Sequence, residues 1–219
     1  MKRRRLEPRV LLAEGKDEQF ALPELLELGG IPWPEKAPPV WLEQFDGVER
    51  LLVRSTLQAE LNASGLEALA LVVDANGNPA GRWQRIHALL TDGDEPLREG
   101  FPDKPDPAGT IHELQGRPRL GVWLMPDNVR SGMFETLLAQ LRKANAALDA
   151  HVESALATAR THGAPYKDTH RDKAALHTWL AWQDPPGQAI STAAKARAFD
   201  TSVDAFAPFI AWARRLFAV

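Results

Sequence analysis

Cysteine is absent from all 219 residues. Its absence excludes a disulfide framework, a thiolate nucleophile and a zinc site built on sulfur, and it suits a reducing compartment. Long hydrophobic runs are missing as well, since no segment approaches the ~20 apolar residues needed to cross a bilayer. The basic start, residues 1–5, is followed by an apolar stretch of only residues 10–13, much shorter than a signal-peptide core. We therefore expect a soluble, cytoplasmic protein without a membrane partner.

Nucleotide-binding and metalloprotease motifs are also missing. The chain has no Gly-x-x-x-x-Gly-Lys loop for ATP and no Gly-x-Gly-x-x-Gly turn after its first apolar run, which argues against a dehydrogenase-like nucleotide domain. His112-Glu113 lacks the second histidine of a metalloprotease helix. His170 and His177 lie seven residues apart, whereas zinc-binding pairs on a helix are usually three or four apart, so we interpret both as structural.

An excess of positive charge is missing, because 26 lysine and arginine residues stand against 29 aspartate and glutamate residues and give a formal net charge of −3. Non-specific affinity for a phosphate backbone normally comes from lysine and arginine, so this balance argues against strong autonomous DNA binding. Local basic clusters occur at residues 2–5 and at Arg214 and Arg215. A bound metal ion can also offset negative charge near a phosphate, so the charge balance does not exclude a nucleic-acid substrate.

What the chain has is enough apolar sequence for one substantial core. Hydrophobic residues make up 44% and charged residues 25%, which excludes a disordered or fibrous protein. The length favours a single domain with a helical extension. Apolar runs bounded by turn residues predict strands at residues 9–15, 40–45, 66–74, 111–114 and 119–125.

Helical patterns alternate with these strands and then continue almost to the end of the chain. They predict helices at about residues 17–28 and 48–62, and another after a turn at residues 76–79, which carries Trp83, Ile86, Leu89 and Leu90. Further helices are predicted at about residues 133–141, 146–161, 172–182 and 203–217. Asp17 is expected to cap the first of them, with Phe20 and Leu22 on its apolar side. Strands alternating with helices are typical of a mostly parallel sheet.

The resulting fold class is α/β: a Rossmann-like, mostly parallel sheet flanked by helices, with a helical C-terminal part. We predict an α/β core at residues 1–145 and a helical extension at residues 146–219, packed together as one structural domain. Aromatic residues support this packing, because Phe206, Phe209 and Phe217 recur at helical spacing. Tryptophans such as Trp179, Trp182 and Trp212 could stack on bases, but we favour packing on the sheet.

Acidic residues follow three of the predicted strands, namely Glu14, Asp74 and Asp127. The carboxyl ends of parallel strands meet at one edge of a sheet, where ligands bind in such folds. Glu18 lies one helical turn after Glu14, and Glu135 opens a later helix. Hard oxygen ligands of this kind suit Mg²⁺ or Mn²⁺. The sequence therefore predicts a divalent-metal site at this edge.

Each acid also has a purely structural interpretation. Asp127, in Pro-Asp-Asn, could make only a turn. Glu135 near a helix start is favoured by the helix dipole without any metal. The functional interpretation rests on several strand-end acids occurring together.

The segment Glu14-Gly15-Lys16-Asp17-Glu18, followed by Asp74-Ala75-Asn76, resembles the Toprim domain, whose signature is a strand-end glutamate and a later Asp-x-Asp. Two further segments, residues 124–135 and 173–183, extend the resemblance over nearly the whole chain. They resemble a bacterial Toprim-like family of uncharacterised proteins, related to the Toprim part of the overcoming-lysogenization-defect (OLD) nucleases.

The resemblance implies a fold, an activity and a set of site residues. Those nucleases cleave DNA with two magnesium-type ions and carry Glu-x-x-x-Glu, Asp-x-Asp, Gly-x-x-Glu and a downstream lysine. Carried over by position, this pattern implies catalytic roles for Glu14 and Lys173 and metal ligands at Glu14, Glu18, Asp74 and Glu135. Asn76 departs from the pattern, because it stands where the second acid of Asp-x-Asp is expected.

The amide of Asn76 supplies an oxygen but no negative charge, so it weakens a metal site. Asp127 could compensate if its strand lies beside that of Asp74. The resemblance thus leaves two functions open. The first is a metal-dependent, phosphodiester-hydrolysing nuclease acting on DNA or RNA. The second is a catalytically impaired interaction module that works with a separate partner such as an ATPase; assembly with further copies of the chain is open under both.

Overall fold

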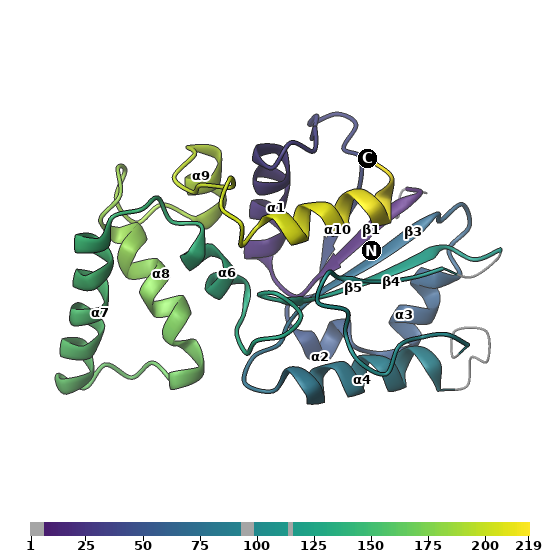
Figure 1. Ribbon diagram of the computed structural model, residues 1–219, viewed down its shortest axis with the longest axis horizontal. Coiled ribbons are helices and arrows are strands. Elements are labelled where there is room, and N and C mark those ends of the chain that lie inside the picture. Colours follow the sequence, from purple (N-terminus) through teal and green to yellow (C-terminus); the bar gives the residue numbers. More distant parts are fainter. Residues whose placement is uncertain (1–6, 93–98, 114–115) are drawn as a thin grey trace.

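A five-stranded sheet forms the centre of the computed structural model, which describes residues 7–92, 99–113 and 116–219 (Figure 1). Its strand order is β2-β1-β3-β5-β4. The strands are β1 (Arg9–Ala13), β2 (Trp41–Gln44), β3 (Ala68–Asp74), β4 (Thr110–His112) and β5 (Arg119–Met125). The five predicted strands are thus confirmed to within about two residues at each end. The basic cluster at residues 2–5 and the end of the fourth predicted strand, Leu114, lie outside the described residues.

The sheet is mostly parallel. β1 pairs in parallel with β2 and with β3, and β3 pairs in parallel with β5, whereas β4 joins the edge antiparallel to β5. The carboxyl ends of β2, β1, β3 and β5 consequently meet at one edge. The protein is an α/β protein with helices on both faces of this sheet, as the alternation of elements predicted.

Both faces of the sheet are buried, and the side chains alternate between two hydrophobic clusters. In β3, Leu69, Leu71 and Val73 face one cluster, while Ala70 and Val72 face the other. This alternation follows from the two-residue period of a strand. It explains why the strands read as continuous apolar runs, since a strand covered on both sides has no polar face.

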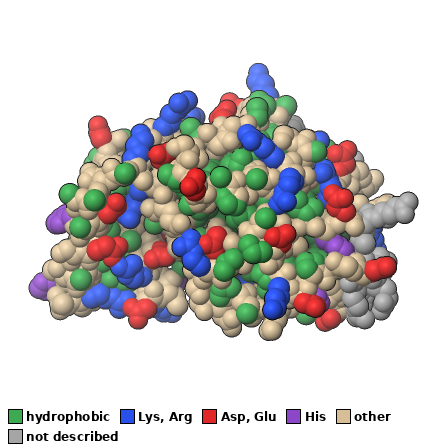
Figure 2. Space-filling model, viewed as in Figure 1, with side chains coloured by type: hydrophobic (Ala, Val, Ile, Leu, Met, Phe, Trp, Pro, Cys, Tyr) green, Lys and Arg blue, Asp and Glu red, His purple; other side chains and the backbone are tan. Residues whose placement is uncertain are grey.

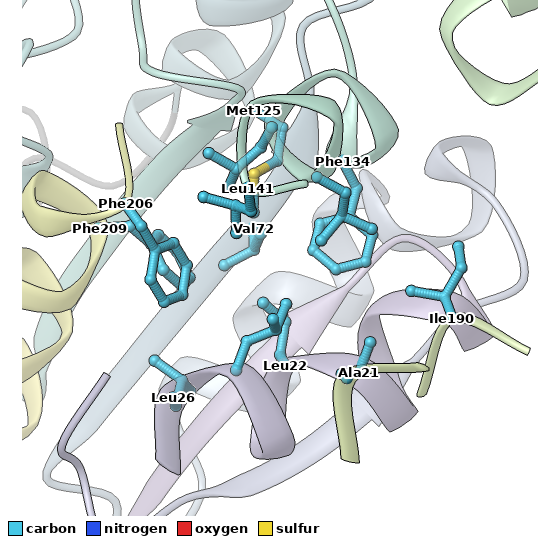
Figure 3. Packing of buried hydrophobic residues seen from close by; sticks show 14 of the residues in the cluster. Ala21, Leu22, Leu26, Val72, Met125, Phe134, Leu141, Ile190, Phe206 and Phe209 are labelled. Carbon is cyan, nitrogen blue, oxygen red and sulfur yellow. The ribbon is translucent and has the colours of Figure 1, made fainter. Parts of the chain in front are cut away.

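One face is covered by α2 (Val48–Leu51), α3 (Arg54–Leu61) and α4 (Pro79–Thr91); the other by α1 (Lys16–Leu28) and α10 (Ala207–Phe217) (Figure 1). Figure 3 shows Leu22 and Leu26 of α1 with Phe206, Phe209 and the strand residues Val72 and Met125 in this second cluster. Of the helices in the described ranges, none combines the length and the apolar character needed to traverse a membrane.

The close fit of α10 depends on Gly121 in β5. A Cβ atom at this position would lie 2.2 Å from Leu216 Cδ2 and 2.9 Å from Trp212 Cζ2, so a larger residue would push the helix away. Phe206, Phe209 and Phe217 are fully buried or nearly so. The predicted packing of the C-terminal aromatic residues on the sheet is thus confirmed for α10.

The remaining helices extend to one side of the sheet. They are α6 (Phe134–Gln140), α7 (Ala146–Thr161), the short 3-10 turn η1 (Asp168–His170), α8 (Arg171–Ala181) and α9 (Ile190–Lys195). α7 and α8 lie side by side at one end of the molecule, and α8 contacts α6 (Figure 1). The predicted division at residue 145 falls between α6 and α7, but α10 beyond it covers the same sheet as α1.

Several local predictions were wrong. The helix predicted at residues 48–62 is two helices, because Leu52 and Val53 leave the helical conformation between α2 and α3. Phe20 was predicted to face inward but is 60% exposed. Asp17 does not cap α1, since Gly15 occupies the cap position and Asp17 lies in the first turn. Trp182 is 42% exposed and stacks on His151 instead of joining the core.

Candidate functional site

A pocket of about 400 Å³ opens at the edge where the parallel strands end. Loops after β1, β2 and β3 and the starts of α1, α6 and α8 surround it. The residues predicted as site members that line it are Glu14, Glu18, Asp74, Asn76, Glu135 and Lys173. Segments far apart in the sequence thus meet in one place.

Glu14 and Asp74 face each other because they follow neighbouring parallel strands. Ala13 pairs with Val72, which puts the residues that follow at the same edge. The backbone N–H of Asp74 donates to Glu14 Oε2 at 3.3 Å. Asp74 Oδ1 in turn accepts from the backbone N–H of Phe134 at 2.8 Å. The start of α6 is thereby tied to the end of β3.

Glu18 enters the pocket from the first turn of α1 and is only 7% exposed. Its carboxylate lies close over Gly15, where an added Cβ would be 2.9 Å from Glu18 Oε2. A larger residue at position 15 would therefore displace this carboxylate. The spacing of four between Glu14 and Glu18 does bring both side chains to the same pocket, as predicted.

Glu135 and Lys173 form an ion pair across the pocket wall. Lys173 Nζ lies 2.8 Å from Glu135 Oε1 and 3.5 Å from Asp17 Oδ2. The Glu135 side chain is 5% exposed and that of Lys173 is 47% exposed. Burial opposes the charge on Lys173, but its hydrogen bond and attraction to Glu135 outweigh this and raise the pKa of the amine. Lys173 therefore stays protonated beside the acids.

The clustered carboxyl groups are hard to ionise together. Burial, with repulsion from Glu135 and Glu14, raises the pKa of Glu18 from 4.5 to about 7. Burial and repulsion from Glu18 and Glu14 raise the pKa of Asp74 well above its usual range. Burial also raises the pKa of Glu14, although its hydrogen bond from Asp74 acts against this. Carboxyl groups with raised pKa values in a cleft are characteristic of functional sites.

Asn76 lines the same pocket in an unusual backbone conformation. Its φ is 52°, in the left-handed region that asparagine and aspartate adopt more readily than most residues. Its backbone N–H donates to Gly132 O at 2.7 Å and its carbonyl accepts from Gly132 N–H at 2.8 Å. These two bonds hold the turn after β3 against the loop that leads into α6.

Asp127 is the predicted ligand that the fold keeps away from the lining of this pocket. Its carboxylate accepts from the backbone N–H groups of Val129 and Arg130 and pairs with the Arg130 side chain. Although burial acts in the other direction, these contacts with Arg130 lower the pKa of Asp127. Asp127 therefore has the turn-forming role that its sequence context allowed. It does not line the pocket, so no contact supports the prediction that it compensates for Asn76.

Some pocket residues were not predicted as site members. Asp46 and Gly47 follow β2, whose carboxyl end lies at the same edge, so a search of every strand end would have found them. His170 was interpreted as structural but is exposed and lines the pocket one turn before Lys173. Lys16 and Asp17 also line it. The signal for His170 was its spacing of three from Lys173.

Hard oxygen donors dominate this pocket, but they are not arranged as a finished metal cage. Within residues 7–92, 99–113 and 116–219, no three or more His, Asp or Glu side chains have the spacing of a formed metal site. Magnesium keeps several waters and uses one or two carboxylates with substrate oxygens. The donor set therefore fits a hydrated divalent cation shared with a ligand.

Fold and site together define a class: an α/β protein with an acidic, lysine-containing pocket at the carboxyl edge of a mostly parallel sheet. The chain belongs to the family described as "Protein of unknown function (DUF3226)", whose model matches residues 8–218. Neither the curated proteins nor the solved structures give a match to the chain. The family description assigns no activity.

Proposed function

We propose that this protein is a Toprim-like, divalent-metal-dependent nuclease that hydrolyses phosphodiester bonds in nucleic acid. One observation carries the proposal: Glu14, Glu18, Asp74 and Glu135, from three separate segments of the chain, line one pocket together with Lys173. A purely structural cluster of this kind is costly, because like charges repel and burial penalises each of them. A divalent cation would relieve that repulsion.

The chemistry of the donors favours magnesium or manganese. All four acids offer oxygen, and neither cysteine nor a pair of helical histidines competes for the ion at this site. Glu14, Glu18 and Asp74 are the residues that would hold the metal, with Glu135 as a further ligand. When bound, divalent ions would polarise the phosphodiester and promote formation of the attacking hydroxide.

Two side chains have roles of their own in this scheme. Glu14 lines the pocket beside Asp74, whose backbone N–H donates to it. The raised pKa of Glu14 suits a carboxyl group that also accepts and returns a proton. Lys173 is charged and half-exposed, so it can neutralise negative charge that develops on the phosphate. This assignment agrees with the roles that the resemblance to OLD nucleases implies.

A second function is favoured by one specific residue. Asn76 lines the pocket where an acid would give the metal another negative charge. Basic and acidic side chains are interspersed on the face shown in Figure 2, so nucleic acid would find little charge attraction there. An interaction module that retains the fold and works with a separate ATPase fits this residue and this surface. We place the nuclease first because the other acids and Lys173 are all in the pocket.

The deciding experiment combines calorimetric titration of Mg²⁺ and Mn²⁺ with a plasmid-nicking assay. We expect wild-type protein to bind Mn²⁺ and to nick plasmid only when the metal is present. Glu14→Ala should abolish nicking, because it removes both a metal oxygen and the acid/base group. The matched control is Asp127→Ala, which removes another strand-end acid whose partner is Arg130 and should leave both measurements unchanged.

The outcomes separate the two functions. Metal binding without nicking by the wild-type protein would support the interaction module. Metal-dependent nicking that survives in Glu14→Ala, or that is lost equally in Asp127→Ala, would remove the proposed mechanism. Absence of both binding and nicking would leave the pocket without a catalytic role.

A further inference from the structure

Two neighbouring residues of α6 contact two neighbouring residues of α8. Glu135 pairs with Lys173 at 2.8 Å, and the hydroxyl of Thr136 donates to Asp172 Oδ2 at 2.5 Å. The first contact lies in the pocket, while neither Thr136 nor Asp172 is among the pocket lining. The second contact therefore lies one residue from the first along both helices and outside the pocket lining.

Thr136 is well placed to support the first contact, because its hydroxyl serves two partners. It accepts from the backbone N–H of Met133 at 2.9 Å while donating to Asp172. The hydroxyl thus fixes the first turn of α6, from which the N–H of Phe134 reaches Asp74. Gly132 leaves room for it, since a Cβ there would lie 2.7 Å from Thr136 Oγ1.

We propose that Thr136 and Asp172 are positioning residues that hold the Glu135–Lys173 ion pair in the acidic pocket. Lysine has a long, flexible side chain, and Lys173 is nearly half exposed, so its ion pair alone does not fix α8. A hydrogen bond to a carboxylate one residue away restricts the first turn of α8 relative to α6. Its importance for catalysis rests on the proposed nuclease function, but its effect on the ion pair does not.

Acylation of lysine amines measures the ion pair without metal or substrate. Only the uncharged amine reacts, and a tenfold change in that fraction corresponds to about one pKa unit. We expect Thr136→Val to increase the acylation rate of Lys173, relative to exposed Lys195 as internal reference, by about threefold or more. Thr136→Ser should restore the wild-type ratio, because it returns the hydroxyl.

Two variants of Asp172 separate the hydrogen bond from the charge. Asp172→Ala removes the acceptor of the same hydrogen bond and should reproduce the increase, which keeps the test decisive if Thr136→Val does not fold. Asp172→Asn keeps an acceptor oxygen and should stay close to wild type. Thr161→Val is the matched control, because it removes a threonine hydroxyl that bonds only within α7, to Thr158 O.

The same variants connect the support to the metal site. If Glu135 is a ligand, Thr136→Val should weaken Mn²⁺ binding by about tenfold, as loss of a group that orients a ligand typically does. An unchanged Lys173 ratio in both Thr136→Val and Asp172→Ala would overturn the positioning role. If the Lys173 ratio rises in both variants but the wild-type protein binds no Mn²⁺, the positioning role is upheld and the metal-dependent nuclease is rejected.

Discussion

Replacing Glu18 by glutamine should stabilise the metal-free protein at pH 8 by roughly 3 kcal/mol, because each pKa unit corresponds to ~1.4 kcal/mol. The pKa of Glu18 rises from 4.5 to about 7 in the folded chain, mainly through burial. At pH 8 the wild-type protein must therefore hold an ionised carboxylate in a place that disfavours it. Glutamine removes this cost and retains the shape. Thermal unfolding should show a midpoint higher by about 6–12 °C.

The pH dependence of this effect has a definite sign. A carboxyl group whose pKa is raised by folding contributes stability below its unfolded pKa and loses it as the pH rises through the folded pKa. For Glu18 that window runs from 4.5 to about 7. The gain from Glu18→Gln should therefore be small at pH 4.5 and complete at pH 8.

Glu27→Gln provides the matched control for this measurement. It removes the same charge from the same helix but at an exposed position that is not among the pocket lining. We expect its unfolding midpoint to follow that of wild type at both pH values. If Glu18→Gln destabilises the metal-free protein at pH 8, the contacts of the Glu18 carboxylate contribute more to the free energy of unfolding than burial and repulsion take away.

The clustering of the acids was predictable because it depends on where the buried parallel strands end, and the apolar pattern of the sequence shows this. Continuous apolar runs indicate strands covered on both faces, and parallel strands end at one edge. Glu14 and Asp74 follow two such runs, so their proximity needed no knowledge of distant contacts. Glu18 followed from helical spacing. Here local pattern and overall fold agree.

Other features depended on packing that no local pattern carries. Asp127 also follows a strand, but the Arg130 side chain and two backbone N–H groups engage its carboxylate, and the sequence does not say which partner an acid takes. The six-residue helix α9 was not predicted, because its Ile190, Ala193 and Ala194 are buried through contact of α9 with α1 and a segment so short has no clear period. Phe20 faces solvent although Ala21 and Leu22, which follow it, are buried.

Asn76 is the residue that distinguishes the two proposed functions, and Asn76→Asp should increase Mn²⁺ affinity by at least about tenfold. A unit charge 4 Å from another gains ~4 kcal/mol at an effective dielectric constant of 20, and tenfold affinity needs only ~1.4 kcal/mol. Aspartate tolerates the left-handed backbone at this position, where φ is 52°. The two backbone bonds to Gly132 do not involve the side chain, so the turn should persist. Calorimetric titration measures the change.

Asn78→Asp is the control, because it adds the same charge two residues away at the start of α4, outside the pocket lining. It should leave the affinity for Mn²⁺ close to that of wild type. Equal affinity of Asn76→Asp and wild type would mean that this side chain does not reach the ion. Tighter binding accompanied by faster plasmid nicking would identify the missing negative charge as what limits the site. Tighter Mn²⁺ binding without plasmid nicking would instead favour the interaction module, because strengthening the metal site would then not be enough to produce cleavage.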